Sequence, residues 1–480
     1  MKSVFLVLSS AIVVFFLTGC SKDSGDTKPK PTELQGIGAF KAKEAIKVLD
    51  IDENPIARAQ VLIGSSLNQP FANNLLETDA NGVFLAPADW SQPLVITISA
   101  KGFVRTSFLQ QLPDGQNFHL RAQAKAGRYE VKGKAQDFII KNGDGLVDFA
   151  LVMVPLKKSD FISVNINKIV SPENDTISVI GQSVSIPSNI SLPQQKESYL
   201  LPVTLNKPIY RTYFPEEGKK RLFALKGQFP LKKVVDELRD NKEFYEVINY
   251  FSLQSGGLRE VSVSGPSTPM DIPIAELQFN QTTSFESPAF ASDEVLLALA
   301  LSEFDGELLP TDLKNVPAKS AAKLVTAAGS TPWLINALTK KDSSNGQISA
   351  FLIPFTRGIR PELLSLLSTP KVIGSGTVQI ATVAPIADLK NRATFAVFST
   401  VTKEKVGGVE LEKLDRLWEV YGPDWVPDFT IPQWPNEPAP AGNKRWEVTL
   451  VGGPEMRASH VGAPMLDSAT HATHSQVDFQ

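Results

Sequence analysis

Short apolar runs, separated by proline, glycine and small polar residues, are the feature that most constrains the fold of this chain. Residues 60–63 (QVLI) and 95–100 (VITISA) alternate in the way that turns one face of a strand toward a core. The 480 residues include 34 prolines and 31 glycines, which divide a chain of this texture into strands and turns. We therefore predict a mainly β protein of serial β-sandwich-like modules, and the length indicates more than one domain.

One clear amphipathic helix is expected in the middle of the chain. Apolar residues recur at helical spacing after Pro230, and the spacing repeats as far as residue 251. Acidic side chains balance the basic ones along this segment, which excludes a membrane-surface helix. We also predict short helical pieces at residues 320–328 and 361–367, and a strand at residues 161–170.

The chain contains a single cysteine, Cys20, so no intramolecular disulfide can form and packed cores must hold each module. A lysine at position 2 and an apolar run at residues 4–17 precede it, which is typical of a secretory signal peptide. The run ends in Leu17, Thr18 and Gly19, directly before the cysteine. This pattern resembles the bacterial lipobox. The resemblance implies cleavage before Cys20, acylation of that cysteine by fatty acids such as palmitate, and anchoring in a lipid bilayer.

Residues 20–33 then supply charges and two prolines but no apolar residue beyond the cysteine, which predicts a flexible tether. In the enterobacterial sorting scheme an aspartate at the next position retains a lipoprotein in the inner membrane, so Ser21 points to the outer membrane. We divide the chain into a signal peptide (1–19), the tether (20–33), a first module (34–122), a middle domain (126–265, with its helix at 230–251) and a C-terminal domain (275–480).

The first module resembles the carboxypeptidase regulatory-like domain, a small transthyretin-like β-sandwich related to carbohydrate-binding folds. The similarity rests on the Pro55-Ile56 entry before the 60–63 strand, on the Thr78-Asp-Ala-Asn-Gly82 turn, and on the strand and turn at residues 96–103. The Asn-Gly pair predicts a hairpin connection, because it tolerates positive φ. The resemblance implies a sandwich without catalytic residues of its own.

Four of the six tryptophans lie in a proline-rich segment at residues 418–446, which we call the Trp-rich segment: Trp418, Trp425, Trp434 and Trp446. Aromatic side chains on loops of β domains can stack on sugar rings or anchor protein interfaces. They can equally cap the core beneath a long crossing loop. The segment is thus a candidate surface for a glycan or a protein partner, with the structural role as the alternative.

Candidate metal ligands are weak. His460, His471 and His474 lie near the C-terminus, but positions 471 and 474 would face opposite sides of a strand. The Asn142–Gly145 stretch (NGDG) fits a turn better than a calcium loop, because it lacks the distal glutamate. We predict no metal and no cofactor.

Composition and motifs narrow the function. The formal net charge is −3, whereas nucleic-acid-binding proteins are usually basic, so the composition argues against nucleic-acid binding. Gly-x-Ser-x-Gly, His-Glu-x-x-His and P-loop motifs are absent from the sequence. We interpret the chain as a lipid-anchored envelope protein with a non-catalytic role in binding, adhesion or structure, its partner a glycan or an envelope protein. The alternative is a hydrolase of envelope polymers with a site in the C-terminal region.

The anchor can be tested directly. Cys20→Ala should release the protein from the membrane fraction, because each acyl methylene removed from the bilayer forfeits ~0.8 kcal/mol. Fractionation followed by immunoblotting measures this, with Ser21→Ala as a control that stays membrane-bound. Full-length Cys20→Ala protein in the membrane fraction would contradict the lipobox interpretation.

Overall fold

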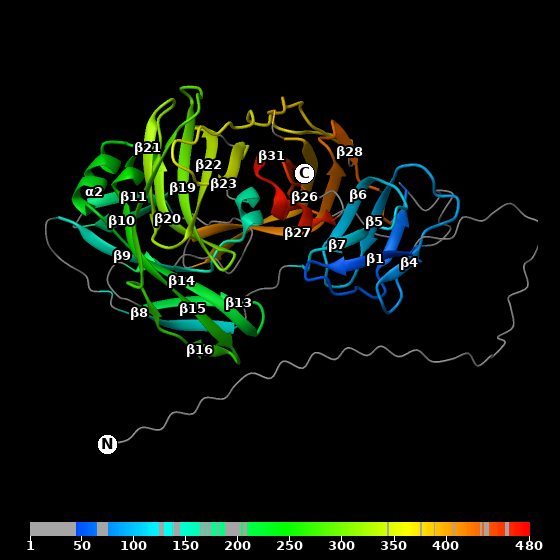
Figure 1. Cartoon of the computed structure of the whole chain (residues 1–480), viewed down its shortest axis with the longest axis horizontal. Helices are drawn as coiled ribbons and strands as arrows, with labels where there is room; N and C mark the ends of the chain where they lie inside the picture. Colours follow the sequence, from blue (N-terminus) through cyan, green and yellow to red (C-terminus); the bar gives the residue numbers. More distant parts are fainter. Residues whose placement is uncertain are drawn as a thin grey trace, which may run out of the picture. The chain divides into compact units, whose positions relative to one another are not determined.

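The computed structural model describes residues 45–480 apart from 65–74, 124–128, 137, 139–144, 164–165, 167–169, 171–173, 180–181, 188–202, 205–208, 343–344, 375–376, 388, 407–408, 433, 436–440 and 457–459. The predicted signal peptide, Cys20 and the tether lie outside these residues, as does most of the NGDG stretch. Lys43–Gln480 forms one compact unit. The prediction of a mainly β protein is confirmed (Figure 1). No helix within the described residues is long and apolar enough to span a membrane.

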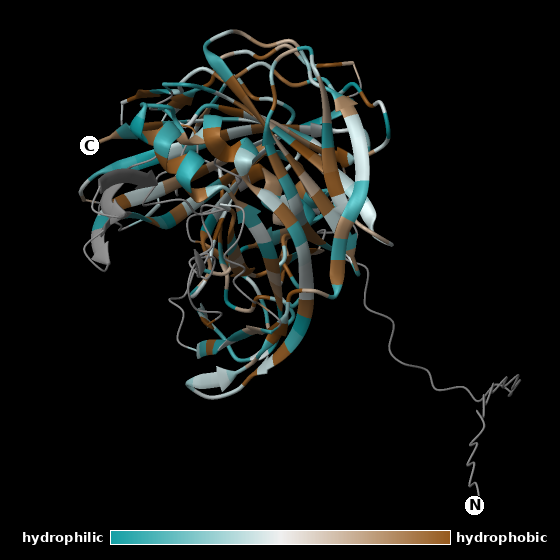
Figure 2. Cartoon of the chain, turned by 90° about the vertical axis from the view of Figure 1, so that its left-hand side faces the viewer, coloured by the Kyte–Doolittle hydropathy of each residue, from teal (hydrophilic) through white to brown (hydrophobic). Residues whose placement is uncertain are grey.

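The largest sheet has twelve strands within the described residues. Their order is β20 (Glu307–Asn315), β19 (Glu294–Phe304), β22 (Thr331–Lys340), β23 (Ile348–Pro354), β31 (His471–Phe479), β29 (Lys444–Gly453), β26 (Asn391–Val406), β27 (Val409–Pro423), β6 (Arg105–Gln111), β5 (Leu94–Ser99), β2 (Gln60–Ile63) and β3 (Leu76–Glu77). Hydrophobic and hydrophilic residues alternate along many strands (Figure 2), as expected where the two faces of a sheet meet different surroundings.

The N-terminal segment forms a two-sheet sandwich. Strands β3, β2, β5 and β6 make one layer, and a smaller sheet makes the other, in the order β30 (His460–Gly462), β7 (Asn117–Leu120), β1 (Ala45–Asp50) and β4 (Val83–Leu85). Their inward side chains belong to one core cluster, which includes Val48, Ile63, Ile98, Phe108 and Phe118. The sandwich itself is as expected, while its kinship to the regulatory-like domain stays a prediction.

The Asn-Gly turn is real but does not close a hairpin. Gly82 adopts a φ of 71°, and the Asp79 carboxylate accepts hydrogen bonds from the amides of Asn81 and Val83, each at 2.8 Å. Strand β3 before the turn pairs with β2, however, whereas β4 after it pairs with β1. The turn therefore carries the chain from one layer of the sandwich to the other, so the hairpin prediction is wrong.

Both layers of this sandwich are extended by C-terminal strands. Strand β27 pairs in parallel with β6, with Trp418 opposite Arg105 and Tyr421 opposite Phe108. Strand β30 pairs in parallel with β7, with Val461 opposite Phe118. The predicted boundaries at 122, 126, 265 and 275 stay a prediction, but strand pairing joins the segments on either side of them.

The middle of the chain builds further sheets. A six-stranded sheet runs in the order β12 (Val203–Thr204), β9 (Val147–Met153), β14 (Gly218–Phe229), β15 (Ser252–Val263), β18 (Leu277–Glu286) and β21 (Ala321–Ala327). Strand β8 (Tyr129–Gln136) lies between β13 (Ile209–Phe214) and β16 (Ser267–Pro269), and also pairs with β17 (Ile272–Pro273). Two small sheets join β10 (Asn174–Val179) to β11 (Gln182–Pro187), and β25 (Thr377–Gln379) to β24 (Lys371–Ile373) and β28 (Asp428–Thr430).

The predicted helix at 230–251 is present but divided. Helix α2 (Leu231–Arg239) follows Pro230, and Asn241 at a φ of 62° ends that helical stretch. Helix α3 (Phe244–Val247) and the 3₁₀ helix η2 (Ile248–Tyr250) follow, α3 beginning with a capping box between Glu243 and Glu246. Two further 3₁₀ helices are η1 (Lys158–Ser163) and η3 (Ala463–Ser468).

Three local predictions differ from the structure. Residues 321–327 form strand β21, not a helix, since they pair with β18 along seven residues. Residues 361–367 have no regular secondary structure. The stretch expected as a strand from 161 begins inside η1 instead.

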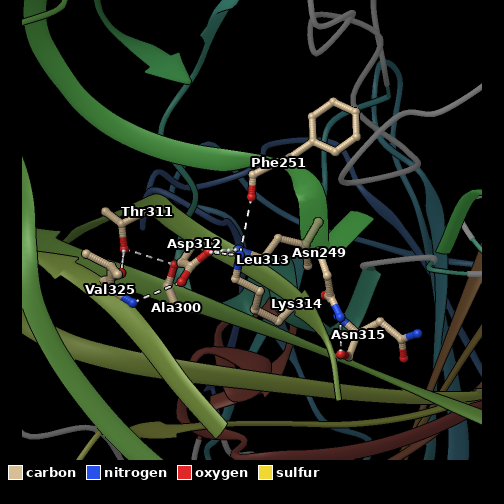
Figure 3. Close-up of polar contacts among 9 residues, drawn as sticks. All are labelled: Asn249, Phe251, Ala300, Thr311, Asp312, Leu313, Lys314, Asn315 and Val325. Carbon is tan, nitrogen blue, oxygen red and sulfur yellow. Dashed lines mark hydrogen bonds and ion pairs between the residues drawn. The ribbon is translucent and has the colours of Figure 1, made fainter. Parts of the chain in front are cut away.

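Strand β20 connects the large sheet to the six-stranded one (Figure 3). The buried carboxylate of Asp312 accepts hydrogen bonds from the amides of Leu313 (2.9 Å) and Val325 (3.1 Å), the latter on β21. Thr311 donates to the carbonyl of the same valine at 2.8 Å. Burial raises the pKa of Asp312 even though the Lys314 ammonium lies 3.6 Å away. The junction is thus held by side-chain contacts to backbone.

A buried ionic network joins β27 to the end of β7, beside the parallel β6–β27 pair. Glu419, 1% exposed, accepts from Arg121 (3.1 Å), Arg416 (2.5 Å) and the hydroxyl of Tyr421 (2.8 Å). Burial alone would raise the pKa of Glu419, but the two arginine charges outweigh it and hold that pKa below its usual value. Because Arg121 directly follows β7 and Glu419 belongs to β27, the network spans the joint between the N- and C-terminal segments.

Glu419→Gln should lower the free energy of unfolding by about 3 kcal/mol, because it leaves two arginines beside a buried position without their counter-charge. Urea denaturation of the purified protein measures the change. Glu260→Gln, which removes an exposed partner of Lys219, is the matched control and should change stability by less than about 1 kcal/mol. Equal effects in the two variants would show that the network does not hold the joint.

Candidate ligand-binding site

The two outer members of the Trp-rich segment are core residues. Trp446 is 1% exposed on β29, with its ring 5.1 Å from that of Phe398. Trp418 is 7% exposed on β27 and donates its indole N–H to the hydroxyl of Ser107 at 2.8 Å. Neither indole has a face open to a sugar ring.

The two inner members are half-buried and each stacks on an arginine. Arg105, on β6, lies between Trp418 and Trp434, 4.7 and 4.5 Å from the ring centroids. Trp425 stacks on Arg392 at 5.2 Å and donates its N–H to the carbonyl of Val451. In this segment, the indoles of Trp418, Trp425 and Trp434 each contact an arginine side chain.

The C-terminal histidines do not converge. His471 and His474 lie three residues apart on β31, and hydrogen bonds at 2.9 Å join the Nδ1 of each to a separate threonine hydroxyl, of Thr470 and Thr449. His460 lies in β30, and its side chain is outside the described residues. Among the residues that the structure describes, no group of three or more His, Cys, Asp or Glu could hold a metal ion.

A pocket of about 470 Å³ lies elsewhere in the C-terminal region, where 3₁₀ helices meet the ends of strands in the large sheet. It is lined by one aromatic ring, three charged groups, two hydroxyls and four apolar residues: Trp333, Lys158, Glu455, Asp467, Ser468, Thr470, Leu352, Pro454, Pro464 and Ala469. This volume falls within the usual range for small-molecule sites, roughly 300–1,000 Å³. We call it the Trp333 pocket.

Two lining residues of the Trp333 pocket, Trp333 and Lys158, both contact the carboxylate of Glu303. The indole N–H of Trp333 donates to Glu303 at 2.6 Å, which sets the plane of the ring. The ammonium of Lys158 lies 4.2 Å from the centroid of that ring and 3.4 Å from the other oxygen of the same carboxylate. The lysine comes from η1, whereas the other two side chains belong to β22 and β19.

The sequence did not single out this pocket. Lys158, Trp333, Glu455 and Asp467 are far apart in the chain and belong to no motif. The pairing of β22, β23 and β31, with η1 and η3 beside these strands, brings the residues that line the pocket together. The proximity is therefore a product of topology.

A second polar group lies on one face of the large sheet. Arg445, 4% exposed, binds Glu412 and Asp478 through its guanidinium, with the shortest contact to each at 2.5 Å. Burial raises the pKa of neighbouring Glu447, although two arginines oppose this. Burial, assisted by the charge of Arg445, lowers the pKa of His474 to about 4. These side chains cross-link strands, and none of them lines the Trp333 pocket.

Comparison with known proteins adds little. Neither a family model nor a curated protein sequence matches this chain. Among solved structures, the Streptococcal ancillary pilin aligns with 67% of this chain and 98% of its own, at 11% identity and a TM-score of 0.14. BcpA, the major pilin subunit of Bacillus cereus, aligns with 67% of this chain and 99% of its own, at 9% identity and a TM-score of 0.13. Such TM-scores carry no argument about function.

The low pKa of His474 predicts a pH dependence. A histidine whose folded pKa is depressed stabilises the fold above its unfolded pKa of 6.5, and this contribution is lost as the pH falls toward 4. His474→Asn should therefore lose less stability than wild type over that interval, by at most about 3 kcal/mol. Urea denaturation at several pH values measures both, and parallel stability curves would contradict the burial of a neutral imidazole.

Proposed function

We propose that this chain is a lipid-anchored protein of the bacterial cell envelope, held in the outer membrane through acylated Cys20, and that its β-rich body binds a glycan without transforming it. The Leu17–Cys20 motif and the polar tether support the anchor. One observation carries the binding role: the Trp333 pocket combines an indole ring with hydroxyls and carboxylates in one cavity of ligand size.

That combination suits a saccharide. Sugar rings present apolar C–H faces, which pack on aromatic rings, and hydroxyls, which pair with polar side chains. In the Trp333 pocket, the hydroxyls of Ser468 and Thr470 each bond within the protein, to Met465 and His471, and would offer a ligand their remaining hydrogen-bonding capacity, while Glu455 and Asp467 supply acceptors. We therefore propose that the glycan binds at the Trp333 pocket and not at the Trp-rich segment, where three of the four indoles contact arginine side chains.

A hydrolase of envelope polymers is the second candidate, favoured by one feature. The pocket lies in the C-terminal region and brings two carboxyl groups, Glu455 and Asp467, to one cavity. Glycoside hydrolysis uses a pair of carboxyl groups on either side of the scissile bond. Turnover of peptidoglycan or a polysaccharide by wild type, lost in Glu455→Gln and in Asp467→Asn, would establish this function and contradict the proposed one.

Trp333→Ala should abolish glycan binding by the full-length chain in detergent, because a single indole supplies the aromatic wall. A glycan array followed by calorimetry on the best ligand measures binding. Trp425→Ala is the matched control and should bind like wild type, since that indole lies outside the pocket.

Trp333 also packs on the core, so its loss alone can disturb folding. Glu455→Ala is therefore a second variant, because that side chain is exposed, and we expect it to bind the glycan roughly tenfold more weakly. Unchanged affinity in both variants would contradict a ligand in this pocket.

A further inference from the structure

The Trp333 pocket already holds a primary ammonium group, that of Lys158. The ammonium makes two contacts, with the indole face of Trp333 at 4.2 Å and with one oxygen of Glu303 at 3.4 Å; we call this position the seat. A hydrogen bond of 2.6 Å joins the indole N–H to the second oxygen of Glu303. An aromatic face beside a carboxylate is a favourable environment for a cation. The wall is thus built to hold an ammonium.

The charge of the lining points the same way. Lys158 and Glu303 neutralise each other as a pair, which leaves the carboxylates of Glu455 and Asp467 as the remaining charges. Both side chains are exposed, and neither forms an ion pair with any residue that the structure describes. Carboxylates that line a cavity attract cations and repel anions.

The Lys158 ammonium can also leave this position readily. Its side chain is 38% exposed and extends from η1 on a flexible four-carbon chain. An exposed ion pair of this kind contributes little net stability, so another ammonium can replace the lysine at small cost. Glu303, at 18% exposure, stays in place because Trp333 holds it.

We propose that the Trp333 pocket selects saccharides that carry free primary amines, and that the ligand ammonium takes the seat of Lys158 on Trp333 and Glu303. This inference rests on the proposed glycan-binding function and specifies its ligand. The hydroxyls of Ser468 and Thr470 form hydrogen bonds with the sugar hydroxyls, while Glu455 and Asp467 attract the amines of neighbouring sugar units. N-acetylated sugars lack the charge and bind weakly.

Two matched probes test the inference: a trimer of glucosamine and a trimer of N-acetylglucosamine, which share one backbone and differ in charge. Calorimetry with the full-length chain should give at least tenfold tighter binding of the glucosamine trimer, weakening as salt is added. Lys158→Met vacates the seat and should tighten that binding by roughly fivefold. Glu455→Gln combined with Asp467→Asn should weaken it by roughly tenfold, whereas exposed Glu77→Gln should leave it unchanged.

Each other outcome has a definite meaning. Equal or tighter binding of the N-acetylated trimer would overturn amine selection and leave the proposed function standing. Weaker binding of the glucosamine trimer by Lys158→Met would overturn the exchange. Binding of Nα-acetyl-lysine amide in place of either sugar would show a site for protein lysines and overturn the saccharide. Binding of none of these probes would overturn the amine inference, and the glycan array would then decide the proposed function alone.

Discussion

The parallel pairing of β6 with β27 is the contact on which the rest of the structure depends. It makes one sheet from the first and last thirds of the chain, and β30 repeats the arrangement on the other layer of the sandwich. A parallel pair needs a long connection, and here nearly three hundred residues intervene. The Glu419 network lies at this joint: Glu419 pairs with Arg416 inside β27, and Arg121 adds a second cation from the N-terminal segment.

The pairing of β27 with β6 and of β30 with β7 constrains the order in which strands can pair during folding. Pairing two strands that are far apart in the sequence costs loop-closure entropy before the contacts form. We therefore expect the N-terminal strands to pair with one another first, and β27 and β30 to be added to the two layers later. The predicted tether precedes β1 in sequence, whereas the Trp333 pocket is lined by residues from 158 to 470. Strand β1 and the residues that line the pocket belong to the same compact unit, Lys43–Gln480.

Short apolar runs bounded by turn residues predicted strands well, as at Gln60–Ile63 and Leu94–Ser99, although consecutive residues of both strands are buried. The same reasoning from the local sequence failed where pairing with a distant strand determines the secondary structure. Residues 321–327 have helix-compatible composition, yet β18 pairs with them throughout, and tertiary pairing overrides propensity. The Asn-Gly turn was likewise correct locally and wrong in what it connects. The pocket left no local signal, because its residues meet only through the large sheet.

The same interaction has different consequences at two places in this protein. Arg105 contacts two indoles, those of Trp418 and Trp434, and it lies opposite Trp418 in the β6–β27 ladder that joins the two segments. Lys158 contacts one indole only, from a side chain that is 38% exposed, and no strand pairing depends on it. Arg105 belongs to the packing of the fold, whereas we propose that the Lys158 ammonium, which lies beside a pocket, can be replaced by a ligand. The composition of residues 418–446 pointed to the tryptophans near Arg105, but only the structure shows which indole lines a cavity.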